Sequence, residues 1–223
     1  MMISTERMFH GFMTIKKNIL IVLAGIFAIS ANADQCSAPK LEVDAMTAAY
    51  RLVLEKWQPA DKGNARRGYN IGAILVNRAG KILAAELNAV IASQDCTQHA
   101  EMRLIQKYIA RTRCFNLQGC SVYTTLEPCM MCAAVMIMAG IEYVYYGQRD
   151  IAFGYISTRA QHNTASYPRS VQCVLLQGPL QQELEQAFNK SGIREITRWL
   201  ATEQARKIFV KHLQIPSDSQ SGK

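Results

Sequence analysis

The sequence predicts an α/β fold: one mixed five-stranded sheet covered by helices on both faces. Short apolar runs, partly β-branched and bounded by Gly or Pro, indicate strands. Apolar residues at three- and four-residue spacing between these runs indicate amphipathic helices. Two of the runs are joined through a helix by short links, which is the pattern of a βαβ unit with parallel strands. With no internal repeat and no second apolar core, we expect a single domain.

The first half of the predicted domain is a helix followed by a hairpin. The helix spans 41–58, because its apolar residues fall on one face and Pro59 stops it. Strands follow at 71–77 and 82–87, joined by a turn that contains Gly80. We expect this pair to be antiparallel, as hairpin strands are.

The second half carries the βαβ unit and the C-terminal helices. A loop over 88–96 leads to Thr97, a fair N-cap for a helix at 98–110. The expected elements after it are a strand at 121–126, a helix at 129–139, strands at 142–147 and 171–176, helices at 179–190 and 193–213, and a tail at 217–223. The connection over 148–170 is long enough for a crossover, so the fifth strand should also be parallel.

Composition excludes whole-chain disorder and fibrous repeats. The 223 residues are 49% hydrophobic and 19% charged, with 25 Lys and Arg against 17 Asp and Glu. The resulting formal charge of +8 and the seven cysteines are the two unusual features. The N-terminal segment affects both, because its removal would change the net charge and export would place the cysteines in an oxidising compartment.

The first 33 residues resemble a secretory signal peptide. Lys16 and Lys17 precede an apolar run at 19–29, and small residues follow at 30–33. A membrane anchor is the alternative, but a spanning helix needs about 18–20 apolar residues. We therefore expect cleavage between Ala33 and Asp34.

Cleavage would leave an exported chain, periplasmic or secreted, with no stable membrane insertion. The domain would then span 34–216, with its core at 41–213. Its charge would fall to 22 basic against 16 acidic residues, a net +6. The sequence does not decide whether the natural start is Met1 or Met13.

Three residues have the spacing and chemistry of a zinc site. His99 opens one predicted helix, and Cys129 and Cys132 share a face in the first turn of another. His and Cys are preferred zinc ligands, and three protein ligands leave one position open, as in catalytic sites. Glu101 could join this site only if the site lies over the helix end. From there its carboxylate could move the proton of an activated water.

Other interpretations exist for each part of this pattern. A Cys-x-x-Cys pair in an exported protein is also typical of a redox pair or of half a disulfide framework. The redox interpretation leaves His99 and Glu101 without a role, so the combined pattern favours zinc.

At these residues the sequence resembles the cytidine/nucleoside deaminase superfamily, whose signature is H-x-E followed by P-C-x-x-C. The segments TLEPCMMC at 125–132 and AGIEYVYYGQRD at 139–150 are most similar to its tRNA-adenosine and guanine deaminase branch. The resemblance is good over 41–152 and loose over 153–213. It implies a three-layer α/β/α cytidine-deaminase-like fold.

The resemblance also implies roles for individual residues. His99, Cys129 and Cys132 would bind Zn²⁺, and Glu101 would be the catalytic proton shuttle. Asn88 and the backbone N–H of Ala100 would bind the substrate, although Asn88 could instead be an Asx-type loop residue. The implied enzyme is a hydrolytic deaminase that releases ammonia from a guanine-, adenosine- or cytidine-type substrate, and a homo-oligomer, commonly a dimer.

Two departures from that branch keep alternatives open. The export signal is unexpected in a tRNA editor, and the usual Pro before His-Ala-Glu is missing. We therefore expect a small-molecule base or nucleoside as substrate. A secreted nucleic-acid deaminase or effector, and a non-catalytic or redox zinc protein, remain alternatives. The pocket walls should come from 60–70 and 148–165, where no pattern identifies the substrate.

The cysteines outside the zinc site pose a separate question. Five remain, namely Cys36, Cys96, Cys114, Cys120 and Cys173. They allow at most two disulfides and one free thiol. We predict a Cys114–Cys120 bond, because these residues bracket the loop that leads into the third strand.

Overall fold

The computed structural model describes residues 42–58, 69–157 and 171–214, all within the compact unit Cys36–Lys223. The predicted signal peptide and the C-terminal tail lie outside the described residues. Within the described ranges, no helix has both the length and the apolar character needed to cross a bilayer.

A single mixed sheet forms the centre of this unit, in the order β2-β1-β3-β4-β5. Its strands are β1 (Gly72–Val76), β2 (Ile82–Leu87), β3 (Ser121–Thr124), β4 (Tyr143–Tyr146) and β5 (Gln172–Leu175). β1 pairs antiparallel with β2 and with β3, whereas β3, β4 and β5 run parallel. The predicted hairpin, βαβ unit and crossover into a parallel fifth strand are confirmed.

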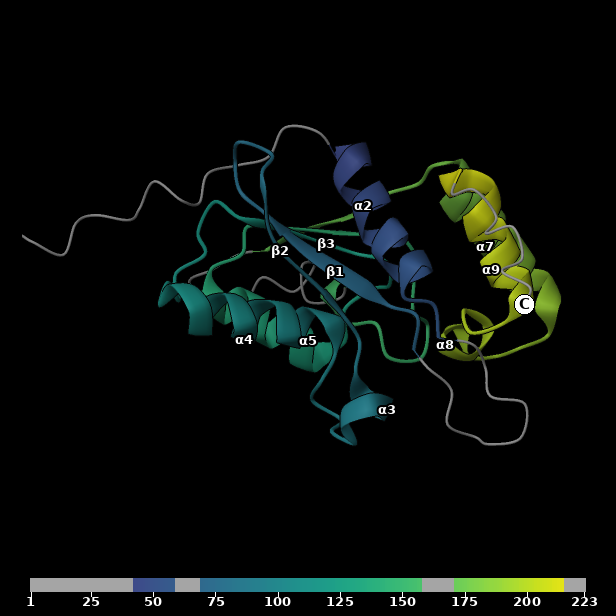
Figure 1. Cartoon of the computed structure of the whole chain (residues 1–223), viewed down its shortest axis with the longest axis horizontal. Helices are drawn as coiled ribbons and strands as arrows, with labels where there is room; N and C mark the ends of the chain where they lie inside the picture. The colour runs from purple at the N-terminus through teal and green to yellow at the C-terminus, as the bar shows by residue number, and fades with distance from the viewer. Residues whose placement is uncertain (1–41, 59–68, 158–170, 215–223) are drawn as a thin grey trace, which may run out of the picture. The chain divides into compact units, whose positions relative to one another are not determined.

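Helices cover both faces of the sheet and complete the predicted three layers (Figure 1). The main helices are α2 (Glu42–Glu55), α4 (Ala100–Thr112), α5 (Met130–Ala139), α7 (Pro179–Ser191) and α9 (Glu203–Leu213). α4 contacts β1, β2 and α5 on one face. α2 contacts β1 and β2 on the other face and also touches α9, which packs against α7.

The core is centred on β1, whose five residues are all buried. Fully burying a side chain such as that of Ile74 or Leu75 stabilises the fold by about 1.5–3 kcal/mol. α2 lies very close to this strand: a Cβ added to Gly72 would be 2.9 Å from Val53 Cγ2 and 3.0 Å from Ala49 O. Glycine at position 72 therefore permits the close contact between helix and strand.

The predicted loop and helix start before α4 need two corrections. Val90–Ser93 forms a one-turn helix, α3, inside the predicted 88–96 loop. The N-cap of α4 is His99, and not Thr97 as predicted. The Thr97 hydroxyl instead donates to Asp95 Oδ1 at 2.7 Å, so the chain turns once more before the helix begins.

The single helix predicted at 193–213 is two helices, α8 (Ile196–Trp199) and α9. Thr202 separates them, because its hydroxyl accepts a hydrogen bond from the Ala205 N–H and so caps α9. This break allows α8 to turn away from the direction of α9 (Figure 1).

Asn70 holds α8 against the start of β1. Its buried side chain donates to Leu200 O at 3.2 Å and to Gln58 O at 2.9 Å, and it accepts from the Gln58 N–H at 2.8 Å. One amide thus joins three segments that are distant in sequence, which places the C-terminal α8 beside the pocket described below.

The predicted Cys114–Cys120 disulfide is wrong, since the structure has no bond between these two sulfurs. Cys120 is buried in the core, whereas the half-buried Cys114 thiol donates to Asn116 O at 3.2 Å. Cys96 and Cys173 form no disulfide either, and Cys36 lies outside the described residues. The short link between Cys114 and Cys120 brings the chain into the sheet without directing their sulfurs at each other.

Candidate metal centre and its pocket

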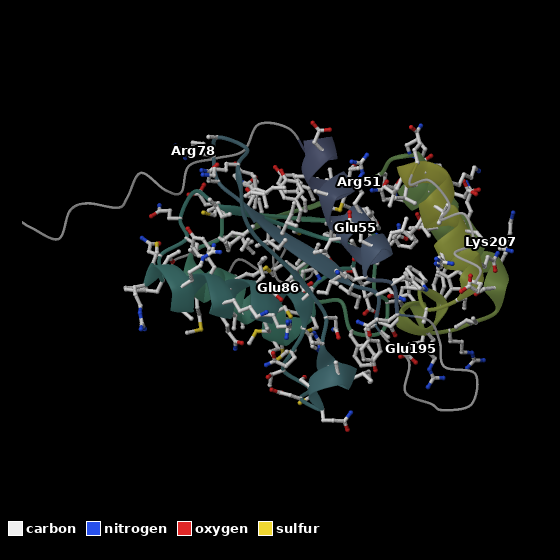
Figure 2. The ribbon with its side chains drawn as sticks, viewed as in Figure 1. Arg51, Glu55, Arg78, Glu86, Glu195 and Lys207 are labelled. Atoms are coloured by element: carbon white, nitrogen blue, oxygen red, sulfur yellow. The ribbon has the colours of Figure 1, made fainter. Side chains whose placement is uncertain are left out.

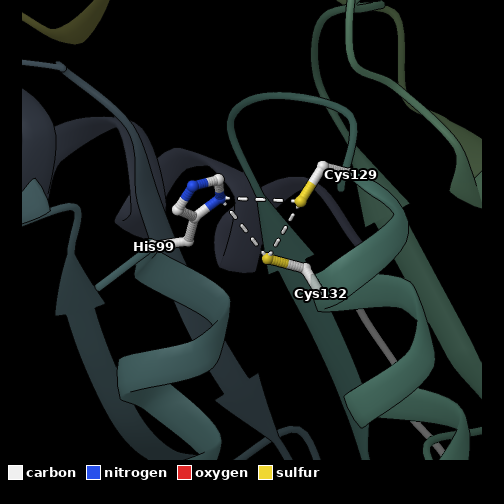
Figure 3. A group of neighbouring side chains, drawn as sticks. All are labelled: His99, Cys129 and Cys132. Carbon is white, nitrogen blue, oxygen red and sulfur yellow. Dashed lines mark hydrogen bonds between the residues drawn. The ribbon is translucent and has the colours of Figure 1, made fainter. Parts of the chain in front are cut away.

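Three side chains from two helix starts form a compact triangle (Figure 3). His99 Nδ1 lies 3.6 Å from Cys129 Sγ and 3.6 Å from Cys132 Sγ, and the two sulfurs are 3.7 Å apart. His99 and Cys129 are the N-caps of α4 and α5, and Cys132 follows in the first turn of α5. The three residues predicted as metal ligands are therefore adjacent.

The triangle fits a tetrahedral zinc ion. With Zn–S near 2.3 Å and Zn–N near 2.05 Å, tetrahedral angles require an S···S distance of about 3.8 Å and S···N distances of about 3.6 Å. All three observed separations agree with these values within about 0.1 Å. Three protein ligands also leave one coordination position for water, which is the arrangement of a catalytic site.

The electrostatics of the triangle favour a thiolate. The neighbouring Cys132 thiol and His99 hold the pKa of Cys129 down at about 4. The same contact with Cys129, together with burial, raises the pKa of Cys132, and the hydrogen bond with Cys129 raises that of His99. Metal binding would therefore displace the proton that the second sulfur retains.

Glu101 lies at this centre, as predicted for a site over the helix end. Its carboxylate is buried; Oε1 accepts from Thr124 Oγ1 at 2.7 Å, and Oε2 lies 3.5 Å from Cys132 Sγ. Burial raises its pKa, which makes the protonated form accessible nearer neutral pH. A carboxyl group in this state can both accept and donate a proton.

A cavity of about 280 Å³ opens onto the triangle. Asn88, His99, Glu101 and Cys129 all line it, whereas Cys132 and Ala100 are buried and are not among its lining residues. This volume lies just below the usual range for ligand pockets, which begins near 300 Å³. The structure thus gathers four of the six predicted site residues at one cavity.

Asn88 combines the two roles considered from the sequence. Its Oδ1 accepts from the Val90 N–H at 3.0 Å, which is an Asx turn, while the residue also faces the cavity. The Asx turn fixes the orientation of the side chain and leaves its amide nitrogen available for a ligand.

The loop after β4 forms another wall and is fastened by buried carboxylates. Glu127 accepts from the Asp150 N–H and the Ser157 N–H, both at 3.3 Å, and from the Ser157 hydroxyl. Asp150 in turn accepts from the Phe153 N–H at 3.1 Å. These bonds hold Phe153, an exposed aromatic ring, at the cavity. Of the two segments predicted to supply wall residues, 148–165 contributes Asp150 and Phe153 and 60–70 contributes Tyr69, while 60–68 and 158–165 lie outside the described residues.

The structure adds Glu195 and Thr197, which the sequence did not indicate. They come from the start of α8 and are brought to the cavity by the Asn70 anchor. Their position depends on a contact between segments that are distant in sequence, so no local motif could have identified them.

The protein-family model of the cytidine and deoxycytidylate deaminase zinc-binding region matches residues 46–148. This segment contains all three residues of the triangle and Glu101. A tRNA-specific adenosine deaminase from Haemophilus influenzae is 30% identical over 130 residues, covering 58% of this chain and 75% of that protein. The chain belongs to this deaminase family. Four of the cavity residues, Asp150, Phe153, Glu195 and Thr197, lie beyond the matched segment.

Two further relatives are deaminases that are named for different substrates. A tRNA-specific adenosine deaminase from Aquifex aeolicus is 38% identical over 84 residues, or 38% of this chain and 55% of that protein. A guanine deaminase from Bacillus subtilis is 37% identical over 83 residues, or 37% of this chain and 53% of that protein. The chain thus spans about half the length of these two deaminases, which act on different substrates by name.

Proposed function

We propose that this deaminase is exported and uses zinc to hydrolyse the amino group from a nucleobase or nucleoside, with release of ammonia. The observation that carries the proposal is the His99, Cys129 and Cys132 triangle, which has tetrahedral zinc spacing and opens onto a cavity beside the buried Glu101.

The proposed roles follow from where each side chain lies. Zinc, when bound, would lower the pKa of water toward neutrality and so supply a nucleophile for the amino-bearing ring carbon. Glu101 would accept the proton of the attacking water and donate it to the leaving amine, which its raised pKa favours. Asn88 would hydrogen-bond the substrate from the cavity wall. The Ala100 N–H, in the first turn of α4 where helix N–H groups lack intrahelical acceptors, would bind a ring carbonyl.

Export is part of the same proposal. It is supported by the basic start, short apolar run and small residues of positions 16–33, which precede the family match. Expression of the full chain in a bacterium with a periplasm should yield a product that begins at Asp34 in the periplasmic fraction. A product that retains residues 1–33 in the cytoplasm would contradict export.

A tRNA substrate is the second candidate, because two of the relatives above are tRNA-specific adenosine deaminases. An RNA substrate predicts strong binding that weakens steeply with salt, since phosphate contacts release counterions. A base or nucleoside substrate predicts turnover that changes little over the same salt range.

The proposed partner is a second copy of the chain. α5 contains no charged residue, and Met130 and Met138 are exposed on it. The β-bridge between Cys129 and Gly154 joins the chain next to Met130 to the chain next to Phe153, and both of these side chains are exposed. Exposed apolar side chains gathered in this way favour a protein contact surface. Sedimentation of the wild type and of Met138→Lys tests this: the wild type should be dimeric and the variant monomeric.

The substrate test is an ammonia-release screen of the zinc-loaded chain. The panel comprises guanine, adenine and cytosine, their nucleosides, and short RNA and DNA. Turnover of a base or nucleoside supports the proposal. Turnover confined to RNA or DNA would favour the second candidate, and no turnover with full zinc occupancy would contradict both.

A further inference from the structure

Glu195 lines the cavity, and its side chain is held in a fixed orientation. It belongs to none of the motifs found in the sequence. Its Oε1 accepts from the Thr197 hydroxyl at 2.9 Å, and its Oε2 lies 2.8 Å from Arg198 Nε. α8 itself is anchored through Asn70 and through the buried side chains of Ile196 and Trp199. Figure 2 labels Glu195 at this helix, below the C-terminal helices. A carboxylate that is oriented before binding loses little side-chain entropy when a ligand arrives.

Glu195 also differs from the other carboxylates that line the cavity. Glu101 is bonded to Thr124 beside the metal ligands, Glu127 fastens the 150–157 loop, and Asp150 caps the turn that carries Phe153. A carboxylate can accept about four hydrogen bonds, and the two contacts of Glu195 leave acceptor sites free. Its side chain is 30% exposed, so a ligand can reach it.

The charge of the wall restricts what can enter. Among the described residues that line the cavity, four are carboxylates and none is Lys or Arg. A cleft lined by one sign of charge repels ligands of that sign and concentrates the opposite or neutral ones. Phosphate groups would meet four carboxylates and no Lys or Arg among the described lining residues, whereas N–H and O–H donors would find a free acceptor at Glu195.

We propose that Glu195 is a substrate-recognition residue, which accepts a hydrogen bond from an N–H or O–H group of a phosphate-free base or nucleoside. The inference rests on the proposed function and narrows its substrate class. The same carboxylate disfavours the corresponding phosphate esters, so Glu195 selects the nucleoside over its monophosphate.

The test compares Glu195→Gln with a matched control on zinc-loaded full-length protein. Glu203→Gln is the control, because Glu203 also pairs with an arginine three residues later but lies outside the cavity. Ammonia release is measured with adenosine, guanosine and cytidine and with their 5′-monophosphates. For the substrate that turns over, Glu195→Gln should raise KM about tenfold to a hundredfold, the effect of losing a hydrogen bond to a charged acceptor. Its kcat should change far less, and its preference for nucleoside over monophosphate should fall.

Binding measurements test recognition by Glu195 separately from the proposed deaminase reaction. Calorimetry with the same nucleosides is run on Glu101→Gln and on Glu101→Gln combined with Glu195→Gln, neither of which needs turnover. Weaker binding in the double variant supports recognition by Glu195 even if ammonia release fails and the proposed function with it. Equal affinity and an unchanged nucleoside-to-monophosphate ratio, or no nucleoside binding at all, would overturn the inference. Thermal unfolding confirms that each variant is folded.

Discussion

The two sides of the cavity are built in different ways. On one side, the starts of α4 and α5 place the metal triangle and Glu101, and every one of these residues belongs to a short local motif. On the other side, α8 supplies Glu195 and Thr197 only because Asn70 ties it to the start of β1. The residues proposed for the reaction are therefore placed by local sequence, whereas the residues proposed for substrate selection are placed by tertiary contacts of the C-terminal segment.

The largest effect is expected on the motif side. Cys132→Ser should abolish zinc retention and reduce ammonia release to background, because a hydroxyl is a far poorer zinc ligand than a thiolate. Zinc content and activity are measured together. Cys173→Ser is the matched control, since Cys173 is a half-buried free thiol on β5 away from the cavity. Equal zinc loss in both variants would contradict the assignment of Cys132.

An intermediate effect is expected where the two sides are joined. Asn70→Ala removes three hydrogen bonds from a buried position and leaves their backbone partners unsatisfied. The free energy of unfolding should fall by about 2–3 kcal/mol. KM should rise, because α8 loses its anchor, while zinc content stays unchanged. Denaturant unfolding and zinc analysis measure these quantities. Loss of zinc along with the KM change would show that the metal triangle also depends on the position of α8.

The smallest effect is a pH dependence of stability from Asp150. Burial raises the pKa of this carboxyl, so the folded state binds a proton more tightly than the unfolded state does. Its contribution is therefore most favourable below the unfolded pKa and is lost as pH rises through the raised folded pKa. Asp150→Asn keeps the acceptor for the Ala152 and Phe153 N–H groups but removes the charge. The variant should thus gain stability relative to wild type as pH increases. A difference that shrinks with rising pH would be the wrong sign.

The hydrophobic periodicity was sufficient to predict most of the helices and strands, because local sequence determines these elements. The strands and the βαβ unit follow from apolar runs punctuated by Gly and Pro, and the structure agrees within a few residues. The errors occur where a side chain decides the local structure. Thr97 bonds to Asp95 instead of capping α4, and Thr202 interrupts the helix expected over 193–213.

In the candidate site, too, the residues set by local sequence could be predicted and those set by tertiary contacts could not. His99, Glu101, Cys129 and Cys132 could be found from spacing, since helix starts place side chains at known positions. Glu195 could not, because its place at the cavity depends on Asn70 contacting Leu200 across the fold. Spacing alone also misled at Cys114 and Cys120, whose proximity in sequence says nothing about the direction of their sulfurs.

The proposed mechanism requires Glu101 to move protons beside a zinc ion held by His99, Cys129 and Cys132. The most direct measurement is zinc content and ammonia release in Glu101→Gln, an isosteric change that keeps an acceptor for Thr124. We predict about one zinc per chain, as in the wild type, with kcat reduced by about 10²- to 10⁴-fold. Full turnover in Glu101→Gln with zinc retained would contradict this role of Glu101.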